Sequence, residues 1–135
     1  PATVEEVPFD AVHQLRMDWH EEDFPGVDAT EFFGLAREVS LARGARVLAV
    51  MEAGVPMAYA QIESVDDAAE IRDVYVHKDR RGHGLGTAVI SAAIRAAPPV
   101  RDLWITADDE DRPKHLYTRL GFRPVTQELQ FLRLP

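Results

Sequence analysis

The sequence predicts an α/β domain built around a mixed β-sheet, and the order of its periodic segments is the main reason. Two segments with the spacing of helices come first, three segments with the alternation of strands follow, and a glycine-rich turn then leads into a long aliphatic segment. Helices and strands in this order are typical of a sheet covered by helices. With 135 residues, 46% of them hydrophobic, the chain is long enough to form a core without a metal or a disulfide. We therefore expect one domain spanning residues 1–135.

Two helices are expected in the first third of the chain. The segments 8–24 and 28–43 repeat apolar residues at helical spacing, and the second begins with Asp28 and Thr30, which are good capping residues. The linker 21–27 ends the first helix. The apolar stripes consist of Val12, Leu15 and Trp19 in the first helix and of Phe32, Leu35, Val39 and Leu41 in the second.

Three strands are expected next. The segments 46–52 and 56–64 are short runs separated by Ala-Gly-Val, which predicts a tight hairpin, and the segment 68–78 follows as a third strand. Strict alternation would place Ile71, Asp73 and Tyr75 on one face of this strand and Arg72, Val74 and Val76 on the other.

The remaining segments continue the alternation of helix and strand. The segment 85–97 is apolar around most of its circumference, which predicts a buried helix that Pro98 and Pro99 terminate. The later elements are a strand at 102–108, a short helix at 112–120 closed by Gly121, and a strand or hairpin at 122–134.

Composition excludes several classes of protein. Cysteine is absent, which removes disulfides, thiolate metal sites and cysteine nucleophiles. The five histidines lack the spacing of metal ligands, so no metal site is expected. No apolar run approaches the length of a membrane span and the first residues do not resemble a signal peptide, so we expect a soluble, cytoplasmic protein. The net charge of −8 disfavours nucleic acid and favours a positively charged partner.

The turn between the third strand and the long helix predicts an anion site. Gly82, Gly84 and Gly86 remove side chains from alternate positions, so main-chain amides and the N-terminus of the helix can converge on one ligand. Arg80 and Arg81 add positive charge beside them. A Walker loop would require a lysine after the last glycine, and a dinucleotide fingerprint requires G-x-G-x-x-G. The pattern that remains is R-x-x-G-x-G, with phosphate as the expected ligand.

This motif, Arg81 to Gly86, resembles the Q/R-x-x-G-x-G/A pyrophosphate loop of the GNAT superfamily of N-acetyltransferases. The segment 115–122, His-Leu-Tyr-Thr-Arg-Leu-Gly-Phe, is similar to the L-Y-x-x-x-G-F motif of the same family. Together with the order of elements, the resemblance covers essentially the whole chain. It implies a GNAT-like mixed, mostly antiparallel central sheet with splayed central strands and about four flanking helices. It also implies transfer of an acetyl group from acetyl-CoA to a primary amine.

The resemblance also implies which residues bind the cosubstrate. The pantetheine arm would pair with the main chain of Val74 and Val76, and the amide of Val74 would point at the thioester carbonyl. The amides expected to bind the pyrophosphate are those of Arg81, Gly82, His83, Gly84, Leu85, Gly86 and Thr87.

Acetylation of an amine also needs proton transfer. An amine such as that of lysine is protonated at pH 7, and a carboxylate can accept its proton. Glu70 lies where histone-modifying members of the family carry a basic glutamate, and Asp73 is the alternative base. By resemblance, Tyr117 would protonate the departing thiolate. Many members carry Asn and Ala at the positions of Glu110 and Pro113. The resemblance therefore does not imply that the side-chain amide contact to pantetheine is made in this chain.

The acceptor is not identified by the sequence. The acidic linker between the first two helices favours a cationic amine, and a polyamine, an aminoglycoside, an amino-acid derivative or a protein amine all fit. The expected partners are acetyl-CoA and a small-molecule or peptide amine, with a homodimer as one expected assembly. Two other classes remain open: an acyl-CoA sensor without catalysis, and a nucleotide-binding module.

Overall fold

The computed structural model describes residues 2–106, 123–124 and 130–133. Within these ranges the chain forms one sheet with the strand order β1-β2-β3-β4-β5-β7-β6. Among the described strands, only β4 and β5 pair in parallel, whereas the other neighbouring strands are antiparallel. The predicted mixed, mostly antiparallel sheet is therefore confirmed. The strands are β1 (Thr3–Val7), β2 (Arg46–Glu52), β3 (Val55–Val65), β4 (Ala68–Val76), β5 (Asp102–Thr106), β6 (Arg123–Pro124) and β7 (Gln130–Arg133).

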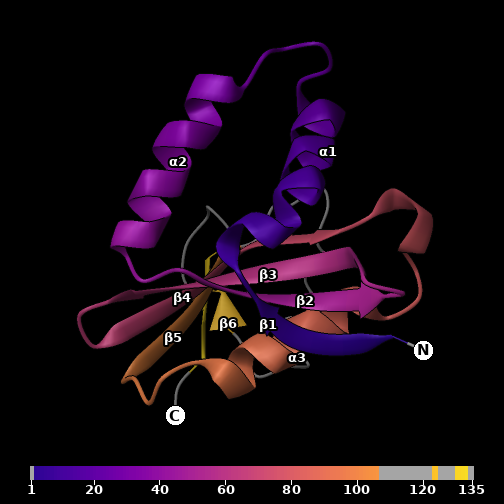
Figure 1. Cartoon of the computed structure of the whole chain (residues 1–135). Helices are drawn as coiled ribbons and strands as arrows, with labels where there is room; N and C mark the ends of the chain where they lie inside the picture. The colour runs from indigo at the N-terminus through magenta and orange to yellow at the C-terminus, as the bar shows by residue number, and fades with distance from the viewer. Residues whose placement is uncertain (1, 107–122, 125–129, 134–135) are drawn as a thin grey trace.

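Helices cover both faces of the sheet (Figure 1). The helix α3 (Leu85–Ala96) packs below β2, β3 and β4, as its apolar circumference predicts. The helices α1 (His13–Asp23) and α2 (Thr30–Ala42) rise from the opposite face as an antiparallel pair, and a 3-10 turn at Phe9–Val12 precedes α1. The helix expected at 112–120 lies outside the described residues. Among the described residues, no helix is both long and apolar enough to cross a membrane.

The core has two parts, one on each face of the sheet. Ile62, Ile71, Val89 and Ile90 belong to the part between the sheet and α3. The part on the α1 side is smaller and consists of Val12, Leu15, Val47, Ala49, Tyr59 and Tyr75. The helix α2 contributes no buried residue to either part. The helix itself was predicted correctly, but its apolar stripe does not pack onto the sheet.

The edge strand β1 was not expected from the sequence. Four of its five residues are exposed, so the segment lacks the apolar alternation that marks a half-buried strand. Pairing with β2 holds it in place, in the register Val7↔Val47. The predicted hairpin between β2 and β3 is confirmed: Ala53 and Gly54 both have positive φ, of 51° and 78°, as the tight turns of hairpins require.

The alternation predicted along β4 is wrong after Arg72. Ile71 and Val74 both lie in the core beside α3, and Tyr75 lies in the core on the other face. The cause is a β-bulge, because Gln61 pairs with Arg72 and Tyr59 pairs with Tyr75, which leaves two β4 residues opposite one residue of β3. Asp73 occupies the bulge with a φ of 54°, a conformation that is costly for residues other than glycine.

Candidate active site at the end of β4

Parallel pairing of β4 with β5 is described over the first half of β4. It runs from Ala68↔Asp102 to Ile71↔Ile105, and Thr106 is the last described residue of β5. Val74 lies in the bulge and has no paired residue on β3. Because the chain that follows Thr106 lies outside the described residues, the splay of the central strands stays a prediction.

The glycine-rich turn follows immediately and leads into α3. Gly82 and Gly84 have φ values of 81° and 80°, so both positions need the freedom that glycine provides. Gly86 has no positive φ, and a Cβ atom there would lie 3.6 Å from Cγ2 of Val76, an ordinary contact. No described residue accepts a hydrogen bond from the amides of Gly82, His83 or Gly84. The first amides of α3 are likewise without partners inside the helix. Main-chain donors are therefore available at this turn, and their convergence on one ligand stays a prediction.

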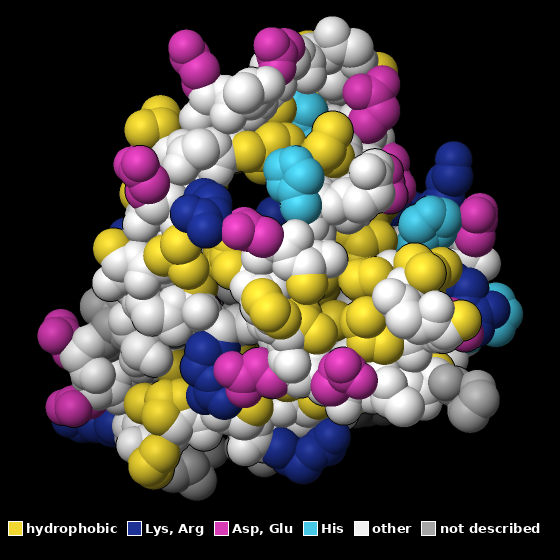
Figure 2. Space-filling model, viewed as in Figure 1, with side chains coloured by type: hydrophobic (Ala, Val, Ile, Leu, Met, Phe, Trp, Pro, Cys, Tyr) yellow, Lys and Arg dark blue, Asp and Glu magenta, His cyan; other side chains and the backbone are white. Residues whose placement is uncertain are grey.

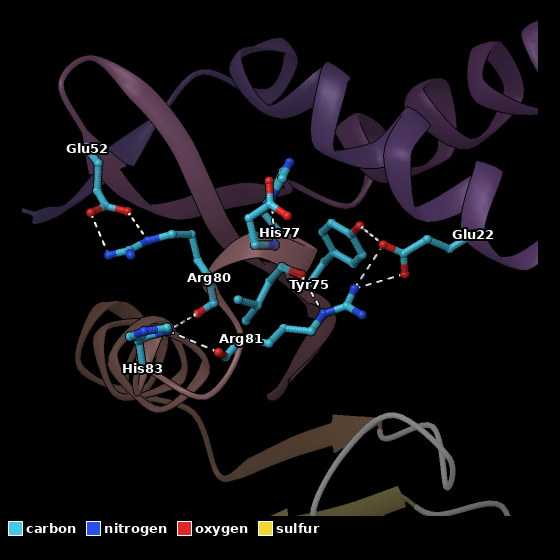
Figure 3. Close-up of polar contacts among 9 residues, drawn as sticks. Glu22, Glu52, Tyr75, His77, Arg80, Arg81 and His83 are labelled. Atoms are coloured by element: carbon cyan, nitrogen blue, oxygen red, sulfur yellow. Dashed lines mark hydrogen bonds and ion pairs between the residues drawn. The ribbon is translucent and has the colours of Figure 1, made fainter.

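The two arginines of the turn are paired with carboxylates (Figure 3). The guanidinium group of Arg80 donates to both carboxylate oxygens of Glu52, at 2.7 and 2.8 Å. Arg81 donates to both oxygens of Glu22, at 3.0 and 2.9 Å, and its Nε donates to the carbonyl of Val76 at 3.1 Å. Their positive charge is thus largely offset locally, contrary to the expectation that they raise the potential of the turn. The turn would bind an anion mainly through its amides.

His83 lies inside the turn but faces its carbonyl groups. Its Nδ1 is 3.2 Å from the carbonyl oxygen of Arg80 and 3.0 Å from that of Arg81. Because both neighbours are acceptors, Nδ1 carries the proton of the neutral ring and donates to them. The side chain of His83 therefore stabilises the turn through these two contacts, and its main-chain amide remains among the candidate donors.

Glu22 connects α1 with β4 and with the turn. The hydroxyl of Tyr75 donates to Glu22 Oε1 at 2.5 Å, beside the ion pair with Arg81. Burial and this hydrogen bond raise the pKa of the Tyr75 phenol. Burial works against ionisation of Glu22, but the hydrogen bonds from Tyr75 and Arg81 prevail and lower the pKa of its carboxyl group. The sequence placed Glu22 only in an acidic linker, and no local pattern connects it with residues 53 and 59 positions away.

The two candidate bases lie near one arginine. Arg72 NH1 is 3.7 Å from Glu70, and Arg72 Nε is 3.8 Å from Asp73. Alternation predicted that the two carboxylates lie on opposite faces of β4, and the bulge at Asp73 is the reason that they do not. Burial raises the pKa of the Asp73 carboxyl group, and the charge of Arg72 only partly opposes this effect. The Asp73 side chain keeps 38% of its surface exposed, and it lines a cavity.

That cavity lies between the α1–α2 pair and the sheet and has a volume of about 1150 Å³. Figure 2 shows the hollow beneath the helices, bordered by hydrophobic, histidine and charged side chains. The polar groups on the sheet side form a hydrogen-bonded network: Arg16 donates to Gln61 at 2.8 Å, and Gln61 donates to Glu63 at 2.7 Å. No local pattern in the sequence predicts this network, because its members come from α1 and from β3.

Several predicted site residues cannot be placed. Tyr117, together with Glu110, Pro113 and the rest of the 115–122 motif, lies outside the described residues. The structure places Glu70, Asp73, Val74 and Val76 along β4, and residues 81–87 in the turn and the first positions of α3. Within the described part of the chain, no group of three or more histidine or acidic side chains could hold a metal ion.

Comparisons with known proteins agree with this geometry. Residues 9–122 match the model of the family described as Acetyltransferase (GNAT) family. A 72-residue stretch, 50% of the chain, is 33% identical to an uncharacterized N-acetyltransferase of Methanocaldococcus jannaschii, and the match covers 31% of the length of that protein.

Solved structures show a similar fold over nearly the full length. An acetyltransferase of the GNAT family from Staphylococcus aureus Mu50 superimposes with a TM-score of 0.77, with 12% identity and 99% of both chains covered. Escherichia coli ElaA gives a TM-score of 0.75 with 20% identity, over 98% of this chain and 99% of that chain. At such identities the likeness concerns the fold.

Proposed function

The chain belongs to the acetyltransferase (GNAT) family, a family of acyl-transferring enzymes, and from this premise we propose that it transfers an acetyl group from acetyl-CoA to a primary amine. The observation that carries the proposal is the structure of the turn between β4 and α3. There, the main-chain amides of Gly82, His83 and Gly84 have no described acceptor, and the N-terminus of α3 follows them directly.

The cosubstrate would bind along this junction. The amides of residues 81–87 would hold its pyrophosphate at the N-terminus of α3, where the helix dipole favours an anion. The pantetheine amides would pair with the main chain of Val74 and Val76, as an added strand does. The carbonyl of Val76 already accepts from Arg81 Nε, and it keeps a second lone pair for such a partner.

The chemistry would take place beside the bulge. The acceptor ammonium group first loses a proton to a carboxylate, for which we propose Asp73 because its raised pKa makes it a stronger base than an ordinary aspartate. The nitrogen lone pair then attacks the thioester carbon, and the carbonyl oxygen gains negative charge that the amide of Val74 would stabilise. The C–S bond breaks, and the nitrogen releases its second proton to solvent as the neutral amide forms. The thiolate takes up a proton, for which Tyr117 is the proposed donor, and the resulting phenolate is reprotonated from solvent.

Release of free thiol tests this proposal. The protein is incubated with acetyl-CoA and a panel of primary amines, and thiol is measured with and without each amine. We expect amine-dependent thiol release and an equal amount of acetylated amine. Saturable binding of acetyl-CoA without turnover across the panel would instead indicate an acyl-CoA sensor. Binding of ATP in preference to acetyl-CoA would indicate a nucleotide-binding module.

A further inference from the structure

We infer that the acceptor is an amine with an apolar, ring-bearing body, bound in the cavity between α1, α2 and the sheet. The inference rests on the proposed acetyl transfer and names the chemistry of its second substrate.

Aromatic side chains form the helical wall of this cavity. The ring of His20 on α1 lies 5.3 Å from Phe24, 6.4 Å from Phe32 and 5.6 Å from Phe33, measured between ring centroids. Phe24 and Phe32 line the cavity and keep 57% and 63% of their surfaces exposed. Rings that are left open to a cavity offer stacked and edge-to-face contacts to another ring.

The helix α2 continues this apolar wall. None of its residues is buried, and Leu35, with 66% of its surface exposed, and Val39 also line the cavity. Large exposed apolar patches on a folded chain usually mark a binding surface. Because α2 stands away from the sheet (Figure 1), the space between them can admit an apolar body. The volume of about 1150 Å³ is sufficient for a molecule of drug size.

Carboxylates line the cavity at its rim and at its sheet end, with rings between them. At the rim, Asp10 pairs with Arg37 at 2.9 Å, and the other acidic lining residues there are Glu21, Asp23 and Asp28. Asp73 lies at the sheet end of the cavity. A charged group placed between the rim and Asp73 would lie among rings, where an uncompensated charge is costly to desolvate. The body of an acceptor whose nitrogen lies at Asp73 is therefore expected to be apolar.

At the sheet end of the cavity, one carboxylate is open to a ligand and the other is buried. Glu63 is 1% exposed, and the guanidinium groups of Arg43 and Arg72 lie 3.6 and 3.7 Å from its Oε1. The Asp73 side chain keeps 38% of its surface exposed, so it is the carboxylate that a ligand can reach. Asp73 directly precedes Val74, the residue proposed to face the thioester. An amine whose ring body lies against α2 and whose nitrogen lies near Asp73 would therefore reach the reaction centre.

Competing acceptors provide the first test. We expect kcat/KM for phenethylamine to exceed the values for ethanolamine and for spermidine by at least about tenfold. A higher kcat/KM for spermidine would overturn the inference, and so would a tenfold preference for a peptide amine over phenethylamine. In either case the proposed acetyl transfer would stand, because thiol would still be released.

Variants provide the second test, with a readout that does not depend on turnover. Phe32→Ala should weaken phenethylamine binding about tenfold in calorimetry without acetyl-CoA, and it should raise KM for this amine while leaving kcat and acetyl-CoA affinity unchanged. Val55→Ala is the matched control, since Val55 is also exposed but does not line the cavity. Equal phenethylamine affinity in all three proteins would contradict the inference. If phenethylamine binds and no amine is acetylated, the proposed function fails instead.

Discussion

Glu22 and Arg81 are separated by 59 positions in the sequence, and their side chains meet at 2.9 Å. This ion pair connects α1, which forms one wall of the acceptor cavity, with the turn proposed to hold the pyrophosphate. Tyr75 completes the group from β4, with its ring stacked on Trp19 and its hydroxyl on Glu22. The two substrate regions therefore share a set of contacts, and changes at one should be measurable at the other.

Loss of the Glu22 charge should destabilise the fold in a pH-dependent manner. Glu22→Gln is expected to lower the free energy of unfolding at pH 7 by about 1–2 kcal/mol, since a hydrogen bond and a partly exposed ion pair are lost. The pKa of Glu22 is lower in the folded chain than its usual value of 4.5. Its contribution is therefore present above pH 4.5 and is lost as the pH falls through the folded-state pKa. Urea titrations of both proteins between pH 7 and pH 3 check this; a constant difference over that range would contradict it.

Two substitutions test whether Asp73 or Glu70 is the catalytic base. Asp73→Asn should lower kcat by about 10²–10⁴-fold and leave acetyl-CoA affinity unchanged. In the wild type, kcat should fall as the pH drops through the raised pKa of Asp73, because the protonated carboxyl group cannot accept a proton. Glu70→Gln is the matched control and should retain most of the activity. If Glu70→Gln loses the activity and Asp73→Asn keeps it, the assignment is reversed.

The same substitution should stabilise the protein. Burial raises the pKa of Asp73, so at pH 7 its ionised form opposes folding. This cost declines as the pH falls through the folded-state pKa and disappears below the usual value of 3.8. Asparagine also tolerates the positive φ at this position. Asp73→Asn is therefore expected to raise the midpoint of urea unfolding at pH 7, with a smaller gain at pH 4. A lower midpoint at pH 7 would show that the pairing with Arg72 outweighs burial.

The three glycines of the turn should not be equivalent. Gly82→Ala and Gly84→Ala each place a side chain at a φ near 80°, which costs about 1–2 kcal/mol of stability and disturbs the amides of the turn. Gly86→Ala should be neutral or slightly stabilising, since this residue is helical and its Cβ atom would meet only an ordinary contact. Thermal unfolding and acetyl-CoA titration of the three variants test this. Equal losses at all three positions would contradict it.

Tyr117 can be tested although the structure does not place it. If it protonates the thiolate, Tyr117→Phe should lower kcat about 10²-fold or more and leave acetyl-CoA affinity nearly unchanged. Steady-state kinetics together with calorimetry separate the two effects. Reduced affinity with unchanged turnover of the bound complex would give Tyr117 a positioning role.

Much of the architecture could be predicted because it depends on local periodicity. The apolar repeat of 85–97 predicts α3, and the Ala-Gly-Val segment predicts the hairpin between β2 and β3. The edge strand β1 was missed because its exposed residues have no apolar alternation. Its extended conformation depends on pairing with β2, which lies about 40 positions further along the chain. The bulge at Asp73 was missed because an aspartate with positive φ looks like any other strand residue in a sequence.

In the candidate site, too, local features could be predicted and long-range contacts could not. The turn 81–87 was predicted from its own glycines, whereas the partners of Arg80 and Arg81 depend on contacts across 28 and 59 positions. The same holds for the network from Arg16 to Gln61, which spans 45 positions. Long-range pairs of this kind follow from the packing of helices on the sheet, which periodicity does not specify.

The central claim is that main-chain amides at the junction of β4 and α3 bind the pyrophosphate of the acyl donor. A calorimetric titration with acetyl-CoA, compared with S-acetylpantetheine, tests it most directly because the second compound keeps the thioester and lacks the pyrophosphate. We predict saturable binding of acetyl-CoA and at least tenfold weaker binding of S-acetylpantetheine. Equal affinities, or no saturable signal with acetyl-CoA, would contradict the claim.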